Sequence, residues 1–124
     1  MLDGLLIAFA LVNLLYGLWA LVDARRAAAL VKLEPQSKMA LGEIRALYGG
    51  LVGALGAITL WSLGHEDQDT ILRMLGLAFV GIALGRIAAL VLDGPTRWNL
   101  LLLIGEGGTA GFLGWAGDQI AKGA

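Results

Sequence analysis

Four ionisable side chains lie inside or at the edges of long apolar runs, where charged residues are uncommon. They are Glu43, Arg45, Arg86 and Glu106. A charge in the middle of a membrane span costs about 2.5–3.5 kcal/mol on insertion scales, so these side chains should face other helices and have partners. An arginine guanidinium can bind a carboxylate through two parallel hydrogen bonds. Two acids and two arginines therefore predict either ion pairs between helices or a polar pocket within the membrane.

The elements that must position these charges are long hydrophobic segments. The chain has 124 residues, of which 58% are hydrophobic and 15% charged, whereas soluble domains are about 45–50% apolar and about 25% charged. A helix needs about 20 mostly apolar residues to cross the hydrocarbon core, and segments 2–22, 39–63, 70–92 and 98–115 meet this requirement. The sequence therefore predicts an all-α integral membrane four-helix bundle, with residues 1–124 forming a single transmembrane domain.

The two halves of the sequence resemble each other weakly. The first segment ends LWALVDARR and the third ends IAALVLDGPTR, while Glu43 and Glu106 each precede a glycine-rich run. This similarity is consistent with two repeated helical hairpins. The alternative is that apolar helices ending in an aspartate and a basic residue look alike without being duplicated.

The depth of the charges along their helices places them at one level. At a rise of 1.5 Å per residue, Arg86 lies about 10 Å inside its segment and Glu106 about 13 Å inside. Tyr48 and Asp93 are added because they share helix faces with Arg45 and Arg86. The resulting candidate layer of buried polar residues comprises Asn13, Tyr16, Glu43, Arg45, Tyr48, Arg86, Asp93 and Glu106.

The pairing within this layer is constrained by the direction of each side chain. At 100° per residue, Glu43 and Arg45 point in nearly opposite directions and cannot pair with each other. One neutral arrangement pairs Glu43 with Arg86 and Arg45 with Glu106, and the exchanged pairing is equally allowed. The layer is then either a structural lock, although buried ion pairs are weak evidence for net stability, or a ligand pocket.

Pairs of glycines four residues apart mark faces on which helices could approach closely. The candidate packing glycines are Gly49, Gly53, Gly81, Gly85, Gly107 and Gly111. They favour packing within the chain, and self-association through the third or fourth segment is the alternative.

Several classes of chemistry are not expected. The chain has no cysteine and a single histidine, His65, which lies in a polar loop. Disulfides and thiolate chemistry are therefore excluded, and no histidine lies in a helix where it could ligate a haem. The acidic residues near His65 match no metal motif. We expect no enzymatic activity, no cofactor, no metal site and, at a net charge of −1, no nucleic-acid partner.

The loops predict an orientation. The basic residues gather in loops 24–38 and 93–97, which four crossings would place on the same side. By the positive-inside rule these loops are cytoplasmic and both termini lie outside, in a bacterial inner (plasma) membrane. Residues 24–38 could form a short interfacial helix before Pro35, with basic side chains suited to anionic headgroups of the lipid bilayer.

Short motifs are spread over most of the chain. The second segment opens with E-I-R-A-L-Y-G-G, and Gly85-Arg86, Asp93-Gly94 and Glu106 follow. In this pattern the chain resembles the bacterial membrane proteins grouped as domain-of-unknown-function family 4345, with a looser similarity to DoxX-like proteins. The resemblance implies a four-helix integral membrane domain and no assigned activity.

These features predict a small multi-pass membrane protein that acts as a non-enzymatic accessory or assembly protein. Its partner would be another membrane protein or a second copy of the chain. The alternative is a binder or transporter of a lipid or of a small polar or anionic molecule that uses the polar layer.

Overall fold

The structure, a computed structural model, describes residues 1–123 and is helical, without a strand in that range. Four helices are long and apolar enough to cross a membrane, namely Leu2–Val22, Lys38–Ser62, Gln68–Leu92 and Arg97–Ala121. The prediction of an all-α membrane fold with four spanning segments is confirmed. The fourth helix extends well beyond the predicted end at residue 115.

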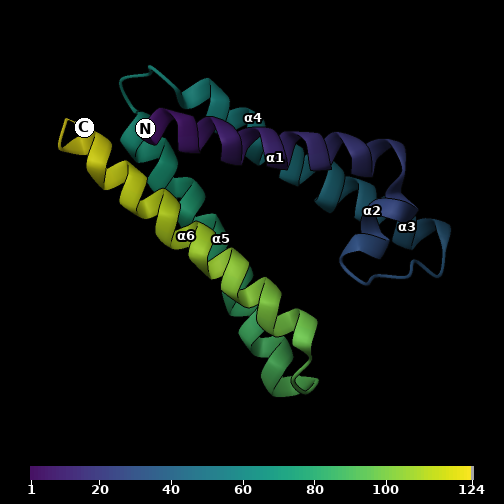
Figure 1. Cartoon of the computed structure of the whole chain (residues 1–124). Coiled ribbons are helices and arrows are strands. Elements are labelled where there is room, and N and C mark those ends of the chain that lie inside the picture. Colours follow the sequence, from purple (N-terminus) through teal and green to yellow (C-terminus); the bar gives the residue numbers. More distant parts are fainter. Residues whose placement is uncertain (124) are drawn as a thin grey trace. The chain divides into compact units, whose positions relative to one another are not determined.

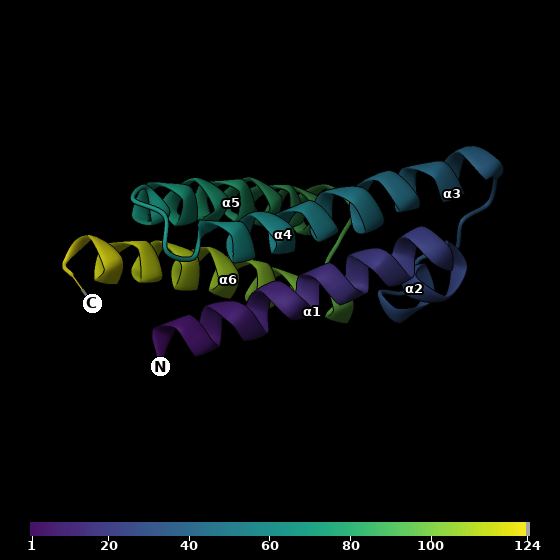
Figure 2. The same cartoon turned by 90° about the horizontal axis from the view of Figure 1, so that it is seen from above.

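The chain divides into two compact units, Met1–Leu63 and a second that begins at Gly64. The first unit contains α1 (Leu2–Val22), α2 (Ala24–Leu30), α3 (Lys38–Ile44), the π-helix η1 (Arg45–Leu51) and α4 (Val52–Ser62). Within this unit, α1 runs beside η1 and α4, and α2 lies at the end where the chain turns back (Figures 1 and 2). The first unit is therefore a helical hairpin with a short helix at its turn.

The hairpin of the first unit depends on glycine. A Cβ atom added to Gly17 would lie 2.6 Å from the Cα of Gly53, and one added to Gly56 would lie 2.5 Å from the carbonyl oxygen of Ala10. No side chain fits at such separations. Close approach of helices through small residues is a common packing mode in membranes.

The segment E-I-R-A-L-Y-G-G contains a widened turn that the sequence analysis did not predict. Residues Arg45–Leu51 form a π-helix, and the backbone N–H of Val52 donates to the carbonyl of Leu47, five residues earlier. Such turns are rare and occur often at functional sites.

The short helix α2 begins directly after α1. Asp23 ends α1, and its side chain accepts a hydrogen bond from the backbone N–H of Arg26, which caps α2. Ala24 and Ala28 are buried against Ile44, and Leu41 and Tyr48 pack on this cluster. A helix was predicted in this stretch, and the structure places it at Ala24–Leu30.

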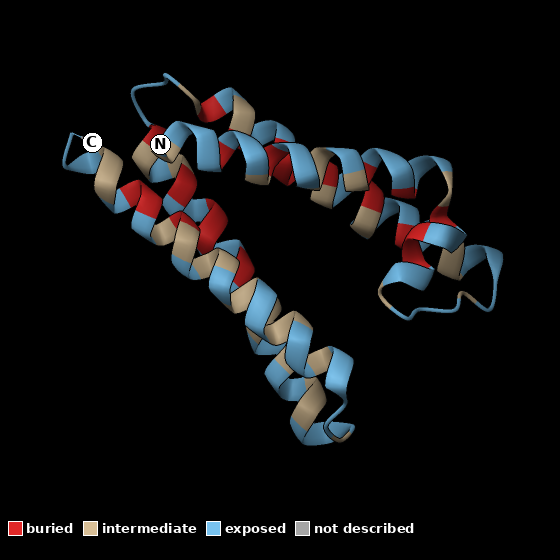
Figure 3. Cartoon of the chain, viewed as in Figure 1, coloured by how far each residue is buried: buried red, intermediate tan, exposed pale blue. Residues whose placement is uncertain are grey.

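The second unit is a hairpin of α5 (Gln68–Leu92) and α6 (Arg97–Ala121). Its turn includes Gly94 with φ of +93°, a conformation that favours glycine. Its buried residues, among them Leu72, Phe79 and Leu113, lie in the half of the hairpin away from this turn (Figure 3). The half next to the turn therefore depends on other contacts.

Candidate functional site

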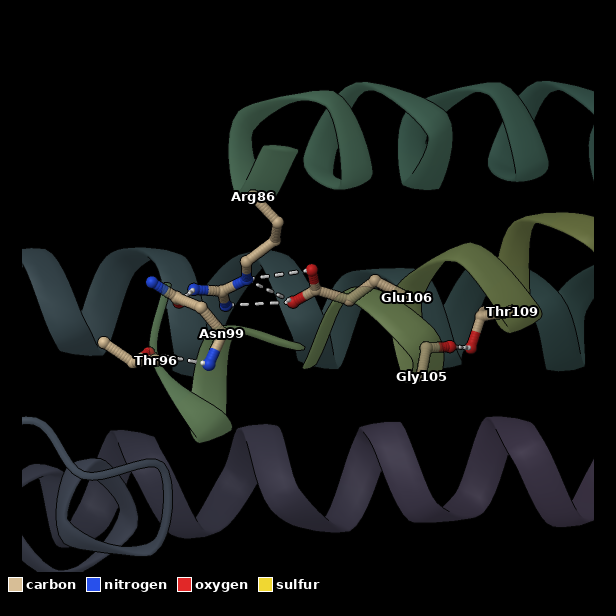
Figure 4. A network of polar contacts seen from close by, with 6 residues as sticks. All are labelled: Arg86, Thr96, Asn99, Gly105, Glu106 and Thr109. Atoms are coloured by element: carbon tan, nitrogen blue, oxygen red, sulfur yellow. Dashed lines mark hydrogen bonds and ion pairs between the residues drawn. The ribbon is translucent and has the colours of Figure 1, made fainter. Parts of the chain in front are cut away.

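The half of the second hairpin next to its turn is joined by an ion pair. Arg86 on α5 donates from Nε to Oε2 of Glu106 on α6 at 3.0 Å, and from Nη2 to Oε1 at 3.0 Å (Figure 4). The two side chains are 22% and 18% exposed. This is the two-pronged contact for which arginine is suited. Glu106 therefore pairs with Arg86, which belongs to the exchanged pairing that the sequence analysis also allowed.

A third side chain completes this contact. The Oδ1 atom of Asn99 accepts a hydrogen bond from Nη1 of Arg86 at 3.2 Å. The backbone N–H of Asn99 in turn donates to Oγ1 of Thr96 at 3.1 Å, which caps the start of α6. The cap therefore fixes the turn of helix that carries Asn99, and both edges of the Arg86 guanidinium are bound by α6.

Asn99 and Thr96 were not among the predicted site residues, although signals for both exist. Threonine directly after Gly-Pro is a typical N-cap. Asn99 lies seven residues before Glu106, which is two helical turns and therefore the same helix face. A neutral polar residue on the same helix face as a charged one is therefore the signal that indicates Asn99.

A second ionic contact lies at the other end of the hairpin. Nη2 of Arg73 is 3.0 Å from Oδ1 of Asp118, and Nη1 is 3.5 Å from Oδ2 of Asp69. The Arg73 and Asp118 side chains are 45% and 59% exposed, so this contact is far less enclosed. Asp118 lies beyond the predicted helix end at residue 115, so this contact involves the part of α6 that was not predicted.

The polar residues of the first unit surround the end of α1. Nη1 of Arg45 donates to the carbonyl oxygen of Leu21, one of the last carbonyls of α1, which lack partners in their own helix. The hydroxyl of Tyr16 donates to the carbonyl of Ala27 on α2 at 2.8 Å. Arg45 and Tyr16 thus hold together α1, α2 and η1 at the turn of this hairpin.

The remaining predicted residues lie elsewhere in the two units. The Asn13 side chain donates to the carbonyl of Phe9 in its own helix at 2.9 Å, and Asp93 is exposed at the end of α5. Glu43 is exposed and lines a groove beside Tyr48. The structure thus brings Arg86 and Glu106 together in one unit and Tyr16, Arg45 and Tyr48 near the turn of the other.

The predicted packing glycines also differ between the units. Gly49 meets the Leu21 side chain, and Gly53 lies against Gly17. Within the α5–α6 hairpin, no described atom lies within 4 Å of a Cβ added to Gly81, Gly85, Gly107 or Gly111. The role of these four glycines in packing stays a prediction. In this hairpin it is Gly76 and Gly117 that lie close to the opposite helix, and neither was predicted.

Four helices able to cross a membrane define a multi-pass membrane protein. The chain belongs to the family described as Domain of unknown function (DUF4345), whose profile matches residues 1–116. This confirms the resemblance inferred from the E-I-R-A-L-Y-G-G, Gly85-Arg86 and Asp93-Gly94 motifs. No curated protein and no solved structure matches the chain.

Proposed function

We propose that the protein is a non-enzymatic membrane component that assembles with another membrane-embedded protein through the outer faces of the α5–α6 hairpin. One observation carries the proposal. Within this hairpin, a Cβ added to Gly81, Gly85, Gly107 or Gly111 would meet no described atom within 4 Å. The hairpin itself therefore does not use these two pairs of glycines, each four residues apart, for close packing, and small residues of this spacing are typical of helix contacts in lipid.

The ion pair supports a structural role in this proposal. Arg86 is bound by both oxygens of Glu106 and by Asn99, so the two charges neutralise each other inside the hairpin. The pair keeps α5 and α6 in register, while a neighbouring protein would shield its exposed part from lipid. A ligand site for an anion at Arg86 has less support, because an incoming anion would have to displace Glu106.

The proposal is tested by the mass of the complex. The tagged full chain would be extracted from its native membrane in mild detergent and measured by light scattering and native mass spectrometry. After the detergent is subtracted, we expect a protein mass greater than that of one tagged chain, which is 13.0 kDa plus the tag. Gly85→Leu and Gly111→Leu should each reduce the assembled fraction about tenfold, equivalent to about 1.4 kcal/mol.

Gly4→Leu is the matched control, because Gly4 also has open space at its Cβ position but lies in α1. It should leave the assembled fraction unchanged. A monodisperse, partner-free wild-type chain would contradict the proposal, and so would equal losses in all three variants. A detergent-corrected mass equal to a multiple of the tagged chain, 13.0 kDa plus the tag, would identify the partner as a second copy.

The proposal includes a bacterial inner membrane location, with loops 24–38 and 93–97 cytoplasmic and both termini outside. It is supported by the basic residues of these loops and by the presence of four helices able to cross. The chain has no cysteine of its own. Lys32→Cys should therefore be protected from a membrane-impermeant maleimide in intact cells, whereas His65→Cys should react. The reverse pattern would invert the orientation.

A further inference from the structure

A groove of about 360 Å³ lies in the first unit beside the E-I-R-A-L-Y-G-G segment. It is formed by the connection that follows α2 and by α3 with the start of η1. Its surface is almost entirely apolar and includes Leu33, Ile44 and Leu47, and the acidic residues that contribute to it, Glu34 and Glu43, are both exposed. Its volume falls within the range of about 300–1,000 Å³ that is usual for small-ligand sites.

The wall and floor of this groove are held in place by the fold. Ile44 is 7% exposed and packs against Ala24 and Ala28 of α2. On the opposite side, the backbone N–H of Leu33 donates to the carbonyl of Ala28 at 2.9 Å, and that of Lys32 donates to Ala29 at 3.1 Å. The groove is therefore preformed, as binding sites usually are.

Two exposed acidic residues, Glu34 and Glu43, lie beside the apolar surface of the groove. Within the first unit, neither Glu34 nor Glu43 has an ion-pair partner among the described residues. Carboxylates accept hydrogen bonds but donate none, so their complement is a group with several N–H donors. Tyr48 lines the same groove, and an aromatic ring adds attraction for a cation.

The position of the groove indicates where such a cation would come from. Lys38 begins the second spanning helix, so Glu43 lies in its second turn, near the end of the span. The apolar side chains of Leu33 and Leu47 are exposed beside it. A ligand here would place its polar group near the membrane surface and its apolar part along the helix, which is how a lipid lies.

We propose that this groove binds a membrane lipid with a primary ammonium headgroup. The ammonium group interacts with the carboxylates of Glu34 and Glu43, and the upper part of an acyl chain lies along Leu33, Ile44 and Leu47. A primary ammonium has three donors for these carboxylates, whereas a choline headgroup has none. Neutral or anionic headgroups without an amine gain nothing from the two acids.

The test is lipid retention by the full chain, measured by native mass spectrometry. The probes are phosphatidylethanolamine, phosphatidylcholine and phosphatidylglycerol with identical acyl chains, in equal amounts. We expect the wild type to retain phosphatidylethanolamine at least fivefold over phosphatidylglycerol. Combined Glu34→Gln and Glu43→Gln substitution, which removes the charges but keeps the shape, should abolish this preference. Glu66→Gln is the matched control, because Glu66 is an exposed acid in the second unit, and it should preserve the preference.

Three results would overturn the proposal. They are equal retention of the lipids by the wild type, an unchanged preference in the double variant, and octylammonium binding as tightly as the lipid, which would identify a soluble amine as the ligand. Circular dichroism of each variant would establish that it is folded. Gly85→Leu, which tests assembly through the second unit, should leave lipid preference intact, so this inference and the proposed function can fail separately.

Discussion

The two helices of each hairpin are held together by different kinds of contact in the two units. In the first, α1 and α4 approach so closely that backbone lies on backbone, at Gly17 with Gly53 and at Gly56 with Ala10. In the second, the half next to the turn has no buried side chain, and Arg86 reaches Glu106 instead. The first hairpin is therefore held mainly by close backbone packing, which an added side-chain atom would disrupt. The second is held partly by an ion pair, which the loss of either charged side chain would disrupt.

The largest expected effect comes from removing one member of the ion pair. Glu106→Ala leaves the Arg86 charge without its carboxylate, and breaking a buried pair in this way costs about 3–5 kcal/mol. Because the pair is 22% and 18% exposed, we expect the loss to lie near the lower end of that range. The measurement is reversible unfolding of the full chain in mixed micelles.

The paired replacement Arg86→Met with Glu106→Leu distinguishes charge from shape. It removes both charges and keeps most of the volume, so it should recover most of the stability lost in Glu106→Ala. If the double variant is as unstable as Glu106→Ala, the loss of stability does not come from an unpaired charge. The proposed difference between the two hairpins would then be wrong.

The next effect tests the hairpin held by shape. In Gly17→Ala the new Cβ would lie 2.6 Å from the Gly53 backbone, and overpacking of this kind costs about 1–3 kcal/mol. Gly4→Ala is the matched control, because Gly4 lies in the same helix as Gly17 and a Cβ added to it meets no described atom within 4 Å. It should be neutral or stabilising by up to about 1 kcal/mol, the helix propensity difference. Similar unfolding midpoints for the two variants would contradict the conclusion that the first hairpin depends on close backbone packing.

The sequence predicts the first helix well but leaves the pairing of charges open, for physical reasons. Asp23 ends the first apolar run, so the predicted and observed bounds of that helix agree. Depth counting correctly placed Arg86 and Glu106 at one level, but angles within one helix do not reveal which helix is its neighbour. The short turn at Gly94 makes α5 and α6 adjacent, which was the stronger guide to the partner of Arg86.

The features that were missed leave little trace in the sequence. The π-helix at Arg45–Leu51 lies within a continuous spanning segment and interrupts neither its composition nor its apolar pattern. Gly76 and Gly117 are the close-contact glycines of the second hairpin, yet neither belongs to the pairs used for prediction. Small-residue spacing identifies faces that can approach closely, whereas the actual contact depends on the crossing of two particular helices.

A smaller loss of stability is expected when either of two helix caps is removed. Thr96 caps α6 and Ser37 caps α3, each by accepting a hydrogen bond from the third residue along. Replacing either residue with alanine should cost about 1 kcal/mol. Only Thr96→Ala should be non-additive with Asn99→Ala, because only that cap positions a residue bound to Arg86. Additive losses in the second hairpin would mean that the cap and the ion pair are independent.

The smallest loss of stability is expected for the more exposed of the two ionic contacts in the second hairpin. Arg73 and Asp118 are 45% and 59% exposed, and exposed pairs contribute about 0.2–1 kcal/mol. Asp118→Asn should therefore lower the stability by no more than this, and the difference from wild type should shrink in high salt because exposed charges are screened. The loss in Glu106→Ala should persist in the same salt, because a largely enclosed pair is screened much less. If salt reduces both losses equally, Arg86 and Glu106 are accessible to water in the folded protein, and the ion pair would then be better understood as part of a hydrated opening than as a lock.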